Sequence, residues 1–295
     1  MSGITRTEAA GTFTESFGKE VIELVTRESV AMSTIRTVPM SDKKDKLPVL
    51  STLPTAAFLA AEGTAKPESN VSWDSKYLTA EEIAVIVPID DSVLNDSQID
   101  IAAQVKALVG QEFARVIDGA VYFGTGAPDS WPTGGMAAAV AGEVVYSDAR
   151  SWGELFDIVE VQGNDVTDVW ASRKIRSGLR TPIIEGQAAP LPDLSTQSIY
   201  GVPPSYPLGW PATPAASTNA IAIAGDSACA IIGVRQDMTF DWSTEATLSG
   251  YGSLFERDAT ALRAVMRIGF VLADPVNIET GTRVLPLAGL LPSAT

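Results

Sequence analysis

The sequence contains no histidine and a single cysteine, Cys229, among its 295 residues. Without imidazole the chain cannot build histidine-dependent serine or cysteine triads, histidine acid–base catalysis or most catalytic zinc sites. One cysteine excludes an intrachain disulfide and any CxxC metal or redox motif. Because the neighbours of Cys229 are small or apolar, we expect a buried, unreactive thiol.

Long apolar runs are also missing, and positive charge is scarce. No run approaches the ~20 residues of a membrane helix, and no apolar stretch of a signal peptide follows the first six residues. The net charge of −15 comes entirely from residues 51–295, which hold 14 Lys or Arg against 29 Asp or Glu. Since an acidic body repels phosphate backbones, we expect no sequence-directed nucleic-acid binding and no membrane partner, with synthesis in the cytoplasm.

Catalytic motifs are absent as well. Carboxylate pairs such as Glu81-Glu82 and Asp90-Asp91 are frequent, as this composition would give by chance, and no short motif places two of them in one cleft. The glycine-rich segment 124–135 follows a predicted helix rather than a strand and lacks a Gly-Lys-Ser/Thr ending. We therefore expect a tight turn there rather than a phosphate loop, and we assign no catalytic, metal or cofactor site.

The N-terminal third predicts two elements suited to contacts with other chains. A capping box of Thr12 and Glu15 opens an amphipathic helix that ends near Ser29. Residues 51–80 contain no helical pattern and carry isolated large side chains, including Trp73 and Tyr77. A long hairpin that projects from the body and packs on a neighbour explains this stretch, because exposed aromatic side chains are costly otherwise.

The middle of the chain predicts a strand followed by a long helix. Strict alternation over Ile83–Ile89 indicates a half-buried strand, which Pro88 either restricts to an edge or ends. Helical periodicity then extends over residues 98–123, with Asp90 and Ser97 as possible N-caps and Gly124 as the stop.

The remainder alternates short strands and helices, which is typical of a mixed α+β domain. A second capping box, Ser151 and Glu154, predicts a short helix, and Ser172 is expected to cap another. Strands are expected at residues 166–170, 199–201, 220–224 and 262–272. The acidic body contains one basic cluster, made of Arg173, Lys174, Arg176 and Arg180. We interpret it as a solvated helix face, with contact to an acidic neighbour as the alternative.

The order of these parts, together with several segments, resembles the major capsid proteins of tailed bacteriophages, which have the Hong Kong 97 fold. The arm from Phe17 to a Val38-Pro-Met40 step is similar to the family's arm, and Phe113 to Gly126 resembles the end of its long helix. Other similar segments are Leu47-Pro-Val49, residues 61–67 with Trp73, residues 86–97, Ala224-Gly-Asp226 and residues 261–271.

The resemblance implies an α+β fold divided into four parts. These are an N-terminal arm (1–50), an extended hairpin called the E-loop (51–84), a P-domain with a spine helix at about 98–123 (85–130 and 236–275), and an A-domain (131–235 and 276–295). The residues expected at subunit interfaces are Phe13, Phe17, Glu62, Lys66, Trp73, Tyr77, Tyr251, Phe255 and Arg257.

The implied function is that of a major capsid protein, not an enzyme, which assembles as pentamers and hexamers into an icosahedral virion shell around double-stranded DNA. Because about a dozen residues precede the first predicted helix, we expect a separate scaffolding protein. A portal is a further expected partner, and decoration proteins are an open possibility. Lys66 and Lys76 have no assignable isopeptide partner, so we expect non-covalent shells. The alternatives are an encapsulin-type compartment shell and, from another class, a histidine-free acidic hydrolase or carbohydrate-binding protein.

Overall fold

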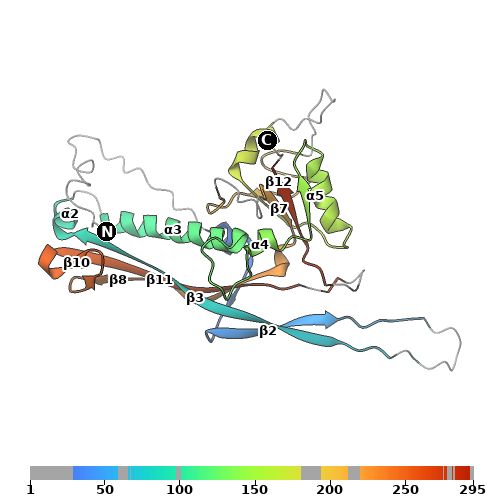
Figure 1. The fold of residues 1–295 in the computed structure, drawn as a ribbon, viewed down its shortest axis with the longest axis horizontal. Helices are drawn as coiled ribbons and strands as arrows, with labels where there is room; N and C mark the ends of the chain where they lie inside the picture. The colour runs from blue at the N-terminus through green and yellow to red at the C-terminus, as the bar shows by residue number, and fades with distance from the viewer. Residues whose placement is uncertain are drawn as a thin grey trace.

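The computed structural model describes residues 29–58, 66, 68–97, 101–180, 194–211, 220–274, 276–277, 281 and 283–292. The helix predicted to begin at Thr12, and the predicted contact residues Phe13, Phe17 and Glu62, lie outside these residues. Two five-stranded sheets form the framework of the described part of the chain (Figure 1).

The first sheet joins strands from both ends of the sequence. Its order is β1 (Arg36–Pro39), β8 (Ala230–Ser243), β11 (Ala259–Leu272), β3 (Ser72–Asp90) and β2 (Lys44–Thr52). Strand β1 runs parallel to β8, and the other neighbours are antiparallel. The strand predicted at residues 262–272 is confirmed as part of β11, in which Leu262 and Ala264 are buried while Arg263 and Arg267 are exposed.

Strand β3 takes part in two different pairings. Residues 72–79 pair with β2, and residues 80–90 pair with β11. The β2–β3 hairpin therefore extends well beyond the body (Figure 1). At Pro88, β3 pairs with β11 on one side, and no described strand pairs with its other side. This part of β3 is therefore a sheet edge, where the missing N–H of proline is tolerated.

A small apolar cluster marks the point where β3 passes from one partner to the other. It contains Met40, Leu78, Ala80 and Val271. Gly269 of β11 faces the backbone here, and a Cβ at this position would lie 2.7 Å from the carbonyl oxygen of Thr79. The missing side chain thus allows the close approach of the two strands. We call the crossing of β3 at residues 78–80 the pivot.

The helix predicted over residues 98–123 is present as α3 (Ile101–Phe123). It lies along the first sheet (Figure 1). Val105, Val109 and Phe113 pack against Leu262 and Ala264 of β11. The helix stops at Gly124, whose φ of +66° is in the left-handed region that glycine adopts without strain. The expected tight turn follows and leads into α4 (Gly135–Ala138).

The second sheet lies beside the C-terminal end of α3 (Figure 1). Its order is β4 (Gly142–Val145), β12 (Leu287–Leu291), β7 (Ala222–Gly225), β5 (Asp168–Ala171) and β6 (Pro204–Ser205). Helix α5 (Ser151–Glu160) covers it with Trp152, Leu155 and Val159. The strands predicted at 166–170 and 220–224 are thus confirmed within two residues.

Two local predictions in this region are wrong. Ser151 is the first residue of α5 rather than its cap, because Arg150 occupies the cap position and the Ser151 hydroxyl lies 3.2 Å from that of Ser147. Residues 199–201 form a turn rather than a strand, with positive φ at Tyr200 and Gly201. By contrast, Ser172 caps a short helix as predicted, since its side chain accepts a hydrogen bond from the N–H of Lys174.

The remaining described elements are short. They are α1 (Val30–Thr34), α2 (Asp91–Asp96), η2 (Arg173–Ile175), α6 (Arg176–Arg180), η3 (Ser227–Cys229), β9 (Thr247–Leu248), β10 (Gly252–Ser253) and η4 (Phe255–Arg257). The main core lies where the C-terminal half of α3 meets both sheets, and it includes Tyr122, Trp170 and Phe270.

Candidate subunit-contact surfaces

The hairpin presents aromatic side chains on one of its faces. Trp73 is 66% exposed and Tyr77 is 52% exposed, and the two residues share a face because side chains alternate along a strand. The ammonium group of Lys44 on β2 lies 4.3 Å from the centre of the Tyr77 ring. Lys66 is also exposed. Large aromatic side chains that a subunit leaves open to solvent are typical anchors for a partner.

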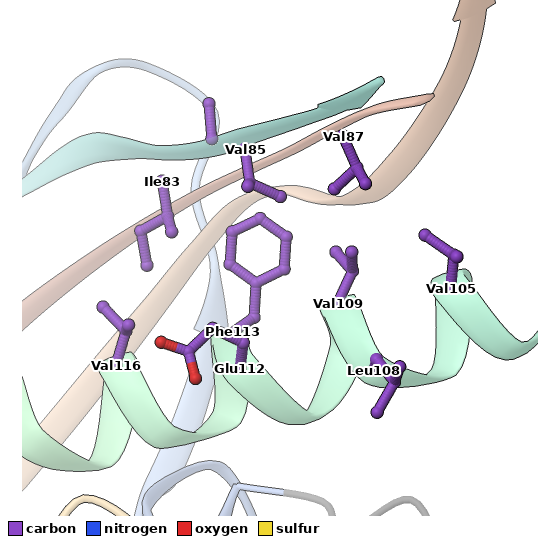
Figure 2. A pocket seen from close by; sticks show the side chains of 10 residues that line it. Ile83, Val85, Val87, Val105, Leu108, Val109, Glu112, Phe113 and Val116 are labelled. Atoms are coloured by element: carbon purple, nitrogen blue, oxygen red, sulfur yellow. The ribbon is translucent and has the colours of Figure 1, made fainter. Parts of the chain in front are cut away.

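An apolar groove runs between β3 and α3. Figure 2 shows Val85 and Val87 of the strand facing Val109 and Phe113 of the helix. The cavity measures about 440 Å³, and Leu108 and Val85 on its lining remain partly exposed. Its one charged lining residue, Glu112, is paired with Arg115 at 2.5 Å. An open apolar surface of this kind is a second candidate contact.

The far end of the first sheet carries the predicted contact residues Tyr251, Phe255 and Arg257. Phe255 is 79% exposed and thus accessible to a neighbour. Tyr251 instead packs within the chain against Leu254, and its hydroxyl donates a hydrogen bond of 2.6 Å to Asp90. Burial and this bond raise the pKa of Tyr251. Arg257, which is also exposed, lies over the Tyr251 ring at 4.8 Å, so Phe255 and Arg257 are the accessible side chains of the three.

A buried carboxylate joins the start of the described chain to the body, and the sequence analysis did not identify it. Asp118 of α3 is fully buried. One oxygen accepts hydrogen bonds from the Ser29 hydroxyl at 2.6 Å and the Ala31 N–H at 3.0 Å. The other accepts from the N–H groups of Leu208 at 3.1 Å and Val30 at 3.3 Å. The sequence signal for a buried carboxylate was an acidic residue within an apolar stretch, between Val116-Ile117 and Gly119-Ala120-Val121.

Chemistry-bearing groups are sparse in the described part of the chain. Cys229 is buried, as expected, and burial raises the pKa of its thiol to about 12. Within the described residues, no three Cys, Asp or Glu side chains gather so as to hold a metal ion. No described helix is both long and apolar enough to cross a membrane.

Comparison with known proteins identifies the family of the chain. The model of the phage capsid family matches residues 10–282. The chain belongs to the phage capsid family. This capsid protein is 31% identical to a solved chain of Microbacterium phage Oxtober96, with 99% of this chain and 100% of that chain covered and a TM-score of 0.77.

Other solved structures extend the similarity. A chain of Mycobacterium phage Bobi is 28% identical to this capsid protein, with full coverage of both chains and a TM-score of 0.81. The capsid of an empty GTA particle computed with C5 symmetry shares the fold at 14% identity, with full coverage and a TM-score of 0.68. None of the curated proteins matched.

These findings confirm the Hong Kong 97 fold and the function of a major capsid protein. The chain is a structural protein that assembles with copies of itself into the shell of a virion. The projecting hairpin and its exposed aromatic face thus belong to a subunit of a shell.

Proposed function

We propose that the chain forms pentamers and hexamers that tile an icosahedral shell around packaged double-stranded phage DNA, without catalytic activity. The match of the family model over residues 10–282 carries this proposal. The acidic body supports it too, because a container with a net charge of −15 does not bind its nucleic-acid cargo tightly. Synthesis in the bacterial cytoplasm, a separate scaffolding protein and a portal complete the proposed assembly, in which decoration proteins are optional and the links between subunits are non-covalent.

We also propose the domain division that the resemblance implies. The first sheet with α3 supports a P-domain of residues 85–130 and 236–275, and the second sheet with α5 supports an A-domain of residues 131–235 and 276–295. Residues 1–50 are the arm and 51–84 the E-loop.

The proposed subunit contacts follow from exposure. On the E-loop, Trp73 and Tyr77 are the anchors, and Glu62 and Lys66 are the proposed contacts from the earlier part of the same loop. Phe255 and Arg257, with Tyr251 beneath, are the proposed contacts at the far end of the first sheet. Phe13 and Phe17 are the proposed contacts of the arm.

The cargo tests this proposal. Particles purified from cells that produce the chain with its neighbouring reading frames should protect double-stranded DNA from added nuclease, and the same particles opened by heat should not. Intact particles that contain an enzyme and no protected DNA would contradict the proposal and identify a compartment shell instead.

A further inference from the structure

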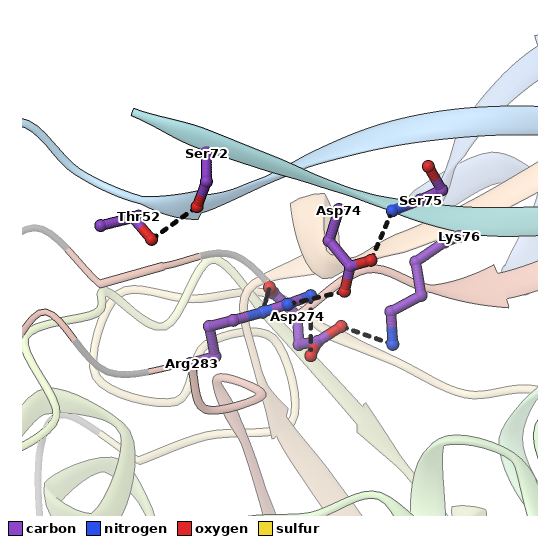
Figure 3. A network of polar contacts seen from close by, with 7 residues as sticks. All are labelled: Thr52, Ser72, Asp74, Ser75, Lys76, Asp274 and Arg283. Carbon is purple, nitrogen blue, oxygen red and sulfur yellow. Dashed lines mark hydrogen bonds and ion pairs between the residues drawn. The ribbon is translucent and has the colours of Figure 1, made fainter. Parts of the chain in front are cut away.

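The E-loop hairpin has a polar face opposite its aromatic face. Ser72, Asp74 and Lys76 alternate along β3 with Trp73 and Tyr77, so the two sets point to opposite sides of the strand. Figure 3 shows that Asp74 and Lys76 point toward Asp274 and Arg283, which lie on the segment that leads from β11 to β12. One side of the hairpin is thus open to neighbours while the other contacts its own chain.

Four charged side chains form a chain of three ion pairs on this polar face. Arg283 lies between two carboxylates, with one Nη 2.9 Å from Asp74 and the other 3.1 Å from Asp274. Its Nε donates to the main-chain oxygen of Asp274 at 3.3 Å. The Lys76 ammonium group lies 2.7 Å from the second oxygen of Asp274. We call Asp74, Lys76, Asp274 and Arg283 the latch cluster.

The cations of the latch cluster favour the ionised form of its two carboxyl groups. The hydrogen bond from Arg283 lowers the pKa of Asp74. Partial burial raises the pKa of Asp274, but the hydrogen bond from Lys76 and the nearby cations outweigh burial and lower it overall. The side chains of Arg283 and Asp274 are only 22% and 26% exposed, against 54% for Asp74 and 35% for Lys76, so solvent screens the two contacts between hairpin and body only in part. The planar guanidinium also fixes the direction of each contact.

The latch cluster lies far enough from the pivot to influence the angle between the hairpin and the body. Asp74 and Lys76 lie four to six residues beyond Ala80 of the pivot, which is roughly 13–20 Å along an extended strand. Among the described strands, β2 pairs with β3 alone. The angle between hairpin and body therefore depends on how β3 bends at the pivot and on contacts made farther out.

We propose that Asp74, Lys76, Asp274 and Arg283 form an electrostatic latch that sets the angle of the E-loop hairpin in the free subunit. Because Asp274 and Arg283 lie between β11 of the first sheet and β12 of the second, the latch also couples the hairpin to the relative position of the two sheets. A shift of one sheet against the other separates these partners and releases the hairpin, while the aromatic face remains free to bind a neighbour. All contacts lie within one chain, so the inference does not rest on shell formation.

Distance measurements between two spin labels test the latch in the unassembled full-length chain. Cysteines introduced at the exposed positions Ala56 on the hairpin and Asp129 on the body take the labels, whereas native Cys229 is buried. With Arg283 present we expect one narrow distance distribution. In Arg283→Gln the distribution should broaden and its maximum should move.

Matched variants separate a latch from general destabilisation. Arg263→Gln removes an ion pair of similar length, 2.7 Å to Asp241, away from the hairpin, and should leave the distribution unchanged. Asp74→Asn should broaden it, and Asp74→Asn combined with Arg283→Gln should add nothing to Arg283→Gln alone, because partners in one contact are not additive. An unchanged distribution in Arg283→Gln, or equal broadening in Arg263→Gln, would overturn the proposal.

Discussion

Replacing Asp118 by asparagine is expected to lower the free energy of unfolding of the subunit by about 3 kcal/mol, because buried donors lose a charged acceptor. The carboxylate accepts from Ser29 and Ala31 through one oxygen and from Val30 and Leu208 through the other. An amide offers an acceptor on one side only, and its NH₂ group faces N–H donors on the other. Equilibrium unfolding in urea of the unassembled subunit measures the loss.

The matched control for this variant is Asp157→Asn, which makes the same chemical change at an exposed position of α5. We expect the control to alter the unfolding free energy by less than about 0.5 kcal/mol. If Asp118→Asn also stays within that range, the carboxylate does not hold the start of the described chain to α3, and our account of this junction is wrong.

Truncating Trp73 to alanine is expected to leave the subunit folded and to weaken assembly strongly. The side chain is 66% exposed in the single chain, so its loss removes little intrachain packing. At an interface, loss of a buried tryptophan costs about 2 kcal/mol or more per contact, which is roughly a thirtyfold weaker contact. The subunit concentration at which sedimenting particles first form should rise accordingly, while the urea midpoint stays the same.

Trp242→Ala provides the aromatic control, since Trp242 is 40% exposed on β8 and has no proposed subunit contact. Its assembly should match that of the unaltered chain. If Trp73→Ala instead unfolds as a monomer, Trp73 belongs to an intrachain core and the hairpin is not the contact element proposed here.

Elements with a strong local pattern were predictable from the sequence. The helical period of α3, the strands β3 and β11, and the stop at Gly124 depend on neighbours a few residues away, and all of them are present. The capping interpretation of Ser151 was wrong because the same Ser-x-x-Glu spacing occurs when the serine is already helical. There its hydroxyl bonds to the preceding loop.

The contacts that organise the candidate surfaces were not predictable, because they join residues that are distant in the sequence. Arg283 and Asp74 are 209 positions apart, and Asp118 bonds to residues 87–90 positions away. Neither pairing leaves a periodic signal. The exposed aromatic residues of the hairpin were predictable as candidates, since their spacing fits no helix and no compact core, whereas the polar face behind them required the structure.

Electron microscopy of sedimented fractions from cells that express the chain, alone and with its neighbouring reading frames, tests the central claim most directly. We expect closed shells, or rings of five and six subunits, in at least one of the two conditions. Small discrete oligomers alone in both conditions would contradict a shell-forming subunit and would favour a binding protein or an enzyme.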